Sequence, residues 1–88
     1  MSEGSNINYE DARIITQLVK EYFERLNPQL GFLLFRIESL SPNTKPGVWV
    51  VKCSFKASFG SNKRLYYELH VSKDGTFEEV KKIAEDEN

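Results

Sequence analysis

Apolar residues recur at intervals of three and four along the first part of the chain. They are Ala12, Ile15, Val19, Tyr22 and Leu26, and the stripe is widened by Ile14, Leu18 and Phe23. This spacing places them on one face of an α-helix. Asn8 can cap the first turn through its side-chain oxygen, and Asn27, which precedes Pro28, disfavours the helical conformation. The pattern predicts a helix over residues 9–26.

Three later segments alternate apolar and polar residues with period two, which is typical of strands with one buried face. We expect these strands at residues 32–40, 48–59 and 64–72. The inward positions of the second strand are Trp49, Val51, Cys53, Phe55, Ala57 and Phe59. Those of the first are Leu33, Phe35 and Ile37, and those of the third are Leu65, Tyr67, Leu69 and Val71. In the register we expect, Phe59 faces Leu65, the hairpin loop is 61–63, and Ser54 faces His70.

Two interpretations compete for the segment after the turn at Lys73-Asp74-Gly75. Thr76 followed by Glu79 has the form of a helix-capping box, and apolar residues then recur with helical spacing. A fourth strand of period two would instead place Glu79 and Lys81 on the inner face beside Phe77. The pattern therefore favours a short C-terminal helix over residues 77–85.

Together these elements predict an α+β fold in the order α-β-β-β-α. The long N-terminal helix packs on a three-stranded antiparallel β-meander, and the two form two layers. We expect one domain over residues 1–88, with mobile tails at 1–7 and 86–88.

One helix followed by three strands, with YYELHV at 66–71 running into the Lys73-Asp74-Gly75 turn, resembles PepSY-type domains. The same order is similar to cystatin-like helix-on-sheet units. The resemblance spans residues 12–75 and implies only the helix-on-sheet arrangement, because it rests on element order and turn residues.

The composition is that of an ordinary globular protein. Of the 88 residues, 40% are hydrophobic and 28% are charged, and a chain of this length forms a single core. The longest apolar run, 32–35, is too short to span a bilayer. The first eleven residues contain acids but no Lys or Arg, so we expect no secretory signal. We expect a cytoplasmic protein with no membrane partner.

The net charge of −1 hides an uneven distribution. Residues 39–67 contain four Lys and one Arg and no acid. One interpretation is that these bases pair with acids on neighbouring elements after folding. The other is that the basic segment 45–64 binds a polyanion or an acidic partner. The candidate residues for anion or partner binding are Lys52, Lys56, Lys63, Arg64 and Tyr66.

The sequence contains no pattern that indicates catalysis. Ser54, His70 and Glu68 could share one sheet face, but a flat solvated face has no oxyanion hole and does not exclude water. The single cysteine, Cys53, cannot form an intramolecular disulfide, and we expect it to be a core residue. With one histidine and no glycine-rich phosphate motif, we predict no catalytic residue, no metal site and no cofactor.

The sequence therefore predicts a small non-catalytic binding or adaptor module that associates with protein, either itself or another chain. The start of the first strand is apolar on both faces, because Phe32 and Leu34 alternate with the inward residues. We expect Phe32 and Leu34 to take part in self-association through a sheet edge or face. The alternative is a nucleic-acid-associated protein that uses the basic segment 45–64.

Overall fold

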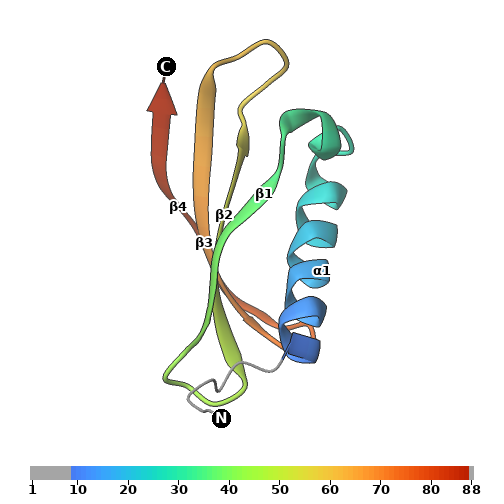
Figure 1. Cartoon of the computed structure of the whole chain (residues 1–88), viewed down its shortest axis with the longest axis vertical. Helices are drawn as coiled ribbons and strands as arrows, with labels where there is room; N and C mark the ends of the chain where they lie inside the picture. The colour runs from blue at the N-terminus through green and yellow to red at the C-terminus, as the bar shows by residue number, and fades with distance from the viewer. Residues whose placement is uncertain (1–8, 88) are drawn as a thin grey trace.

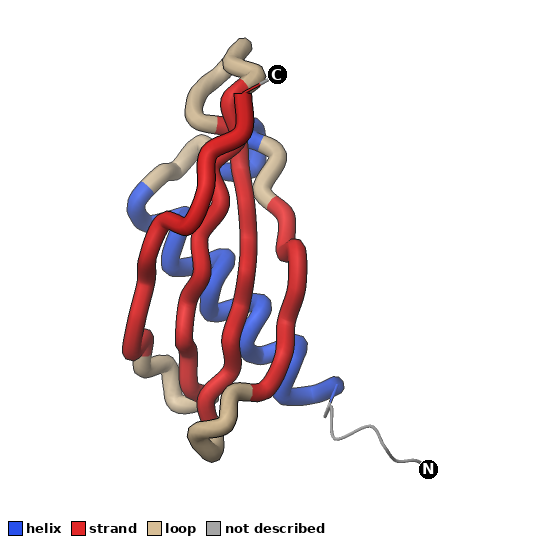
Figure 2. The backbone as a smooth tube through the Cα atoms, turned by 90° about the vertical axis from the view of Figure 1, so that its left-hand side faces the viewer, coloured by secondary structure: helices blue, strands red, loops and turns tan. Residues whose placement is uncertain are grey.

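The chain folds into one long helix laid across one face of an antiparallel sheet (Figure 1). The structure is a computed structural model, and it describes residues 9–87. Its elements are α1 (Tyr9–Leu26), the 3-10 helix η1 (Leu30–Leu33), β1 (Arg36–Pro42), β2 (Val48–Lys56), β3 (Lys63–Ser72) and β4 (Phe77–Glu87). The strand order is β1-β2-β3-β4, so β1 and β4 form the two edges (Figure 2). The α+β class and the helix over residues 9–26 are confirmed.

Helix α1 buries the stripe that its sequence predicts. Ile15, Val19 and Phe23 are its buried residues, while Glu10 and Asp11 occupy the first turn, at the positive end of the helix dipole. Leu26, which the spacing assigned to the same stripe, is 67% exposed because α1 ends there.

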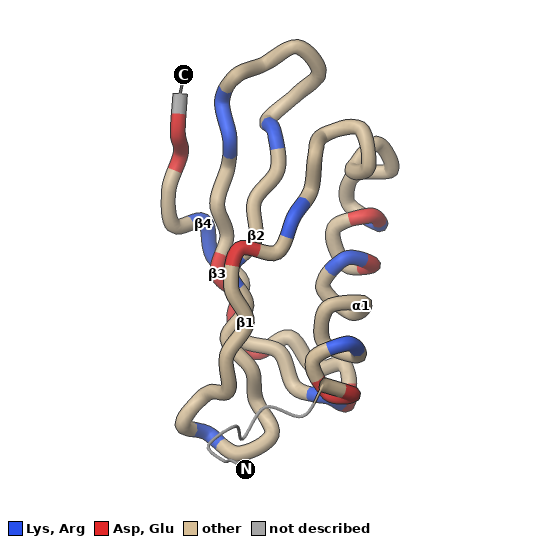
Figure 3. Tube along the Cα trace, viewed as in Figure 1, with Lys and Arg blue, Asp and Glu red and all other residues tan. Residues whose placement is uncertain are grey.

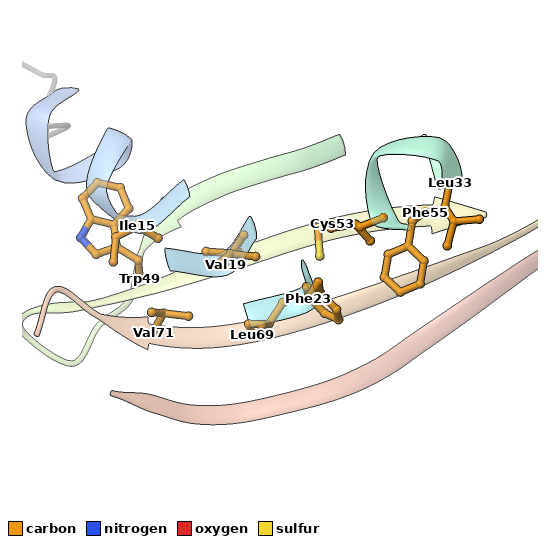
Figure 4. Close-up of a cluster of buried hydrophobic side chains, with 11 residues drawn as sticks. Ile15, Val19, Phe23, Leu33, Trp49, Cys53, Phe55, Leu69 and Val71 are labelled. Atoms are coloured by element: carbon orange, nitrogen blue, oxygen red, sulfur yellow. The ribbon is translucent and has the colours of Figure 1, made fainter. Parts of the chain in front are cut away.

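Strand β2 supplies the centre of the core (Figure 4). Trp49, Val51, Cys53 and Phe55 alternate along it, and all four are buried. Phe55 lies edge-on to Phe23 of α1 with ring centroids 5.3 Å apart. On the neighbouring strand β3, Leu69 and Val71 are fully buried, so the predicted inward face of that strand is confirmed.

The C-terminal segment is a strand, so the predicted helix over residues 77–85 and the three-stranded sheet are wrong. β4 pairs antiparallel with β3, with Phe77 opposite Val71 and Val80 opposite Leu69. A register shift at His70/Val71 inserts one extra residue between these pairs. The β-bulge turns Phe77 and Val80 to the same face although they are three residues apart, a spacing that sequence alone attributes to a helix.

The ends of the chain differ in part from the expectation. The tail predicted for residues 1–7, together with Asn88, lies outside the described residues. Asp86 and Glu87, which we expected in a C-terminal tail, belong to β4.

The β2–β3 hairpin has a different register from the one that the sequence predicts. Leu65 faces Phe55, not Phe59, and Ser54 faces Tyr66, not His70. The hairpin loop is therefore longer than expected and contains Phe59, which is 59% exposed. Because the slip is an even number of residues, the inward face of β2 up to Phe55 is unchanged.

Strand β1 begins later than predicted. It starts at Arg36. Leu30–Leu33 form the 3-10 helix η1, which takes the place of the first two residues of the expected strand. Leu33 is nevertheless buried, and Phe35 and Ile37 pack against the core.

Truncation of Phe55 tests this arrangement of the core. Phe55→Ala removes a buried ring and leaves a cavity, so it should lower the free energy of unfolding by about 3–5 kcal/mol. Phe59→Ala is the matched control, and its cost should stay within about 0.5 kcal/mol because the ring is exposed. Urea denaturation measures both values. Equal losses for the two variants would contradict the placement of Phe59 in the loop.

Candidate functional site

Three large apolar side chains are exposed at the end of the molecule where η1 and the β2–β3 loop lie (Figure 1). Phe32 is 73% exposed, Phe59 59% and Leu34 55%. The rings of Phe32 and Phe59 contact each other, with centroids 5.8 Å apart. We call Phe32, Leu34 and Phe59 the apolar end surface. A cluster of exposed apolar side chains of this kind is typical of an interaction site.

The backbone of Leu34 is held in an unfavourable conformation. Its φ of 56° and ψ of 50° lie in the left-handed region, and among the described residues it is the one non-glycine with positive φ. For an L-residue with a side chain this conformation costs about 1–2 kcal/mol. A conformation of this cost persists only where neighbouring groups enforce it.

Arg64 of β3 enforces the conformation of Leu34. Its Nη1 and Nη2 donate to the carbonyl oxygen of Leu34 at 3.1 and 2.9 Å. The two donors bind one acceptor from a rigid planar group, which fixes the position of the carbonyl. The same Nη1 also donates to Ser54 Oγ on β2 at 3.1 Å. Arg64 thus ties the end of η1 to the two central strands.

Ser54 is the buried centre of a polar cluster on the outer face of the sheet. Its hydroxyl accepts the Arg64 bond and donates to Glu38 Oε2, while Arg36 Nε donates to the same carboxylate oxygen at 2.7 Å. Ser54 is fully buried, so the expectation of a flat solvated face at this position is wrong. The register of β1 shifts between Ile37 and Ser39, so Glu38, which accepts from Ser54, is the extra residue of a β-bulge.

These contacts define the chemistry of the cluster. The hydrogen bond from Ser54 holds the pKa of Glu38 below its usual value, and the bond from Arg36 adds to this effect. Behind the cluster, burial raises the pKa of the Cys53 thiol to about 12, so this side chain is a neutral core residue. Arg36, Glu38, Ser54 and Arg64 therefore join β1, β2 and β3.

A second polar group lies farther along the outer face. His70 Nε2 is 2.9 Å from Glu68 Oε2, and His70 Nδ1 is 3.7 Å from Glu79 Oε1. The contact with His70 lowers the pKa of Glu68. Within residues 9–87, no group of three or more His, Cys, Asp or Glu is arranged to hold a metal ion.

Four of the five residues predicted for anion binding share one face of the β2–β3 hairpin, and the fifth lies on the other face; Figure 3 marks the lysines and arginines along these strands. Lys52, Lys56, Arg64 and Tyr66 share the outer face, whereas Lys63 shares the opposite face with Leu65. Lys52 is exposed and lies opposite Glu68, Lys56 lies opposite Arg64, and half-buried Tyr66 lies opposite Ser54.

The acids of β4 lie beside part of the basic segment. Lys63 Nζ is 2.9 Å from Glu85 Oε1, and Lys45 Nζ is 2.9 Å from Glu78 Oε1. Bonds from Lys82 and then Lys63 lower the pKa of Glu85 to about 2. These ion pairs favour the interpretation in which the bases are neutralised by a neighbouring element.

Sequence reasoning missed two residues of this region. Phe59 was assigned to the core, although Ser58 and Gly60-Ser61-Asn62 around it are typical loop residues. Ser54 was placed on a solvated face, and no local pattern shows that it is buried and bonded to Glu38.

Comparisons with known proteins found no matching family model, no matching curated protein and no matching solved structure. Within the part of the chain that the structure describes, no helix is long and apolar enough to cross a membrane.

The polar cluster predicts a contribution to acid stability. Since the folded-state pKa of Glu38 lies below the 4.5 of an unperturbed glutamate, its stabilising contribution is complete above that pH. The contribution is lost as the pH falls through the folded-state value. Glu38→Gln should therefore lose less stability than wild type between pH 5 and pH 2, as measured by chemical denaturation at each pH.

Ser54→Ala removes the main cause of the lowered Glu38 pKa. It should therefore also reduce the loss of stability between pH 5 and pH 2. A Glu38→Gln profile that runs parallel to that of wild type would show that this carboxylate is not engaged in solution.

Proposed function

We propose that the chain is a small non-catalytic protein-binding module whose apolar end surface docks a segment of a partner protein. The observation that carries this proposal is that Phe32, Leu34 and Phe59 are exposed together on a fixed backbone. Aromatic side chains that are held in place contribute most of the energy in many interfaces.

The conformation of Leu34 supports a binding role. A glycine would adopt the left-handed backbone without cost, and Leu34 contributes little to the core because it is 55% exposed. Arg64 stabilises this costly arrangement through two hydrogen bonds. Its consequence is a pre-organised apolar surface, which lowers the entropy lost on binding.

The surroundings of this surface indicate the chemistry of the partner. Lys56 and Arg64 lie at the base of the loop that carries Phe59, where Ala57 N donates to Lys63 O at 3.0 Å. Lys56 and Arg64 face each other across the strands, which places two positive charges beside this surface. The partner segment should therefore combine aromatic or aliphatic anchors with adjacent Asp or Glu.

The alternative of a nucleic-acid-associated protein stays a prediction, as does the cytoplasmic location. The ion pairs of Lys45 and Lys63 with glutamates of β4 weaken the positive field that a polyanion would meet. We therefore prefer the protein partner.

Selection from a library of random peptides displayed on phage tests the proposal. Against the immobilised protein, enriched peptides should contain an aromatic or aliphatic residue next to Asp or Glu. The double variant Phe32→Ser, Phe59→Ser should bind these peptides at least about tenfold more weakly in fluorescence polarisation, because it removes both anchors.

Tyr9→Ser is the matched control, because Tyr9 is an aromatic residue that is 84% exposed and lies at the start of α1. It should leave peptide affinity unchanged, and all variants should unfold at nearly the wild-type temperature. Failure to enrich any peptide, or equal binding by the double variant, would refute the proposed function.

A further inference from the structure

Strand β4 is an open edge of the sheet. It has 11 residues and, among the described residues 9–87, β3 is its one neighbouring strand, so its other side leaves backbone groups without a strand partner there (Figure 2). The opposite edge, β1, has 7 residues, ends in Pro42 and is interrupted by a register shift. Both edges have register shifts, but short strands and prolines block edge pairing, so the longer β4 is the edge more suited to accept another strand.

The charges in the first seven residues of β4 are antisymmetric about Val80. The sequence from 77 to 83 is FEEVKKI, in which two acids precede Val80 and two bases follow it. When a second copy of this strand lies antiparallel with Val80 opposite Val80, Glu79 of each copy faces Lys81 of the other, within the stretch 79–82 that has no register shift. This pair then occurs twice by symmetry.

The structure places the central residues of this pairing on matching faces. Between its two register shifts β4 runs regularly from Glu79 to Lys82. Glu79 and Lys81 lie on the outer face with His70 and Glu68, whereas Val80 lies on the helix face with Leu69. A two-fold axis perpendicular to the sheet keeps every side chain on its own face, as antiparallel pairing requires.

Neighbouring registers are disfavoured by the same charges. A slip by two residues in one direction places Glu79 opposite Glu79, and a slip in the other direction places Lys81 opposite Lys81. Like charges directly opposite each other destabilise a strand pair, so the sequence selects one register against its competitors.

We propose that two copies of this chain associate through β4 in this register and form a continuous eight-stranded antiparallel sheet with both α1 helices on one face. Glu79 and Lys81 are exposed in the single chain, where Lys81 Nζ lies 3.4 Å from Glu79 Oε2 and His70 Nδ1 lies 3.7 Å from Glu79 Oε1. Exposed ion pairs of this kind contribute little to the stability of the single chain. Their rearrangement therefore opposes association only weakly. The new backbone hydrogen bonds and the Val80 contact supply the attraction.

Sedimentation velocity at protein concentrations from about 5 to 500 µM tests this proposal. Wild type should shift from monomer to dimer across this range. Lys81→Glu and Glu79→Lys should each weaken dimerisation by about tenfold or more, because two attractive pairs become repulsive. An equimolar mixture of the two variants should restore it, because the acids of one copy then face the bases of the other.

The double swap Glu79→Lys, Lys81→Glu in one chain keeps opposite charges opposite and should dimerise within about threefold of wild type. If one of the single variants proves unstable in thermal unfolding, the double swap still tests the charge pairing. Wild type that stays monomeric, single variants that dimerise like wild type, or folded variants that no mixture or double swap rescues would each overturn the proposal.

The double variant Phe32→Ser, Phe59→Ser distinguishes association through β4 from association through the apolar end surface. It should leave dimerisation unchanged, so the β4 interface and the proposed peptide-binding function can fail independently. A dimer that this variant abolishes and Lys81→Glu does not affect would place self-association at the end surface instead.

Discussion

The guanidinium of Arg64 joins parts of the chain that are far apart in sequence. From β3 it reaches the buried hydroxyl of Ser54 on β2 and the carbonyl of Leu34, which is 30 residues away, at the end of η1. This one side chain therefore binds the backbone at Leu34, two residues before β1 begins. Through Ser54 it also orders Glu38 and Arg36 on the outer face. The exposed surface that we propose for binding depends on this group because the backbone that carries it is otherwise strained.

The fold was predictable where a single periodicity governs the segment. Helical spacing located α1, and alternation located the buried face of β2 even though the hairpin register is shifted, because an even slip leaves the faces unchanged. The same reasoning failed at β4, where a bulge gives Phe77 and Val80 a helical spacing within a strand. The pairing of β4 with β3 is a tertiary contact, and local pattern does not report it.

The candidate site was predictable only in part. Phe32 and Leu34 stood out because they alternate with inward positions, and both are exposed. Phe59 was missed because the alternation of β2 continues by chance into the loop. The role of Arg64 was missed because its partner is a backbone carbonyl, which carries no sequence signal. The acid-free segment could not be interpreted without β4, which supplies the glutamates beside Lys45 and Lys63.

The central claim is that Arg64 holds the backbone at Leu34, and amide chemical shifts of Arg64→Met measure it most directly. Methionine has a similar length but no donors, so the carbonyl of Leu34 loses both bonds. Outside the neighbours of residue 64 on β2, β3 and β4, the largest changes should fall on residues 32–35, which lie far from the substitution in sequence. Unchanged amide signals for residues 32–35, in a variant whose β2–β3 signals do shift, would contradict the account.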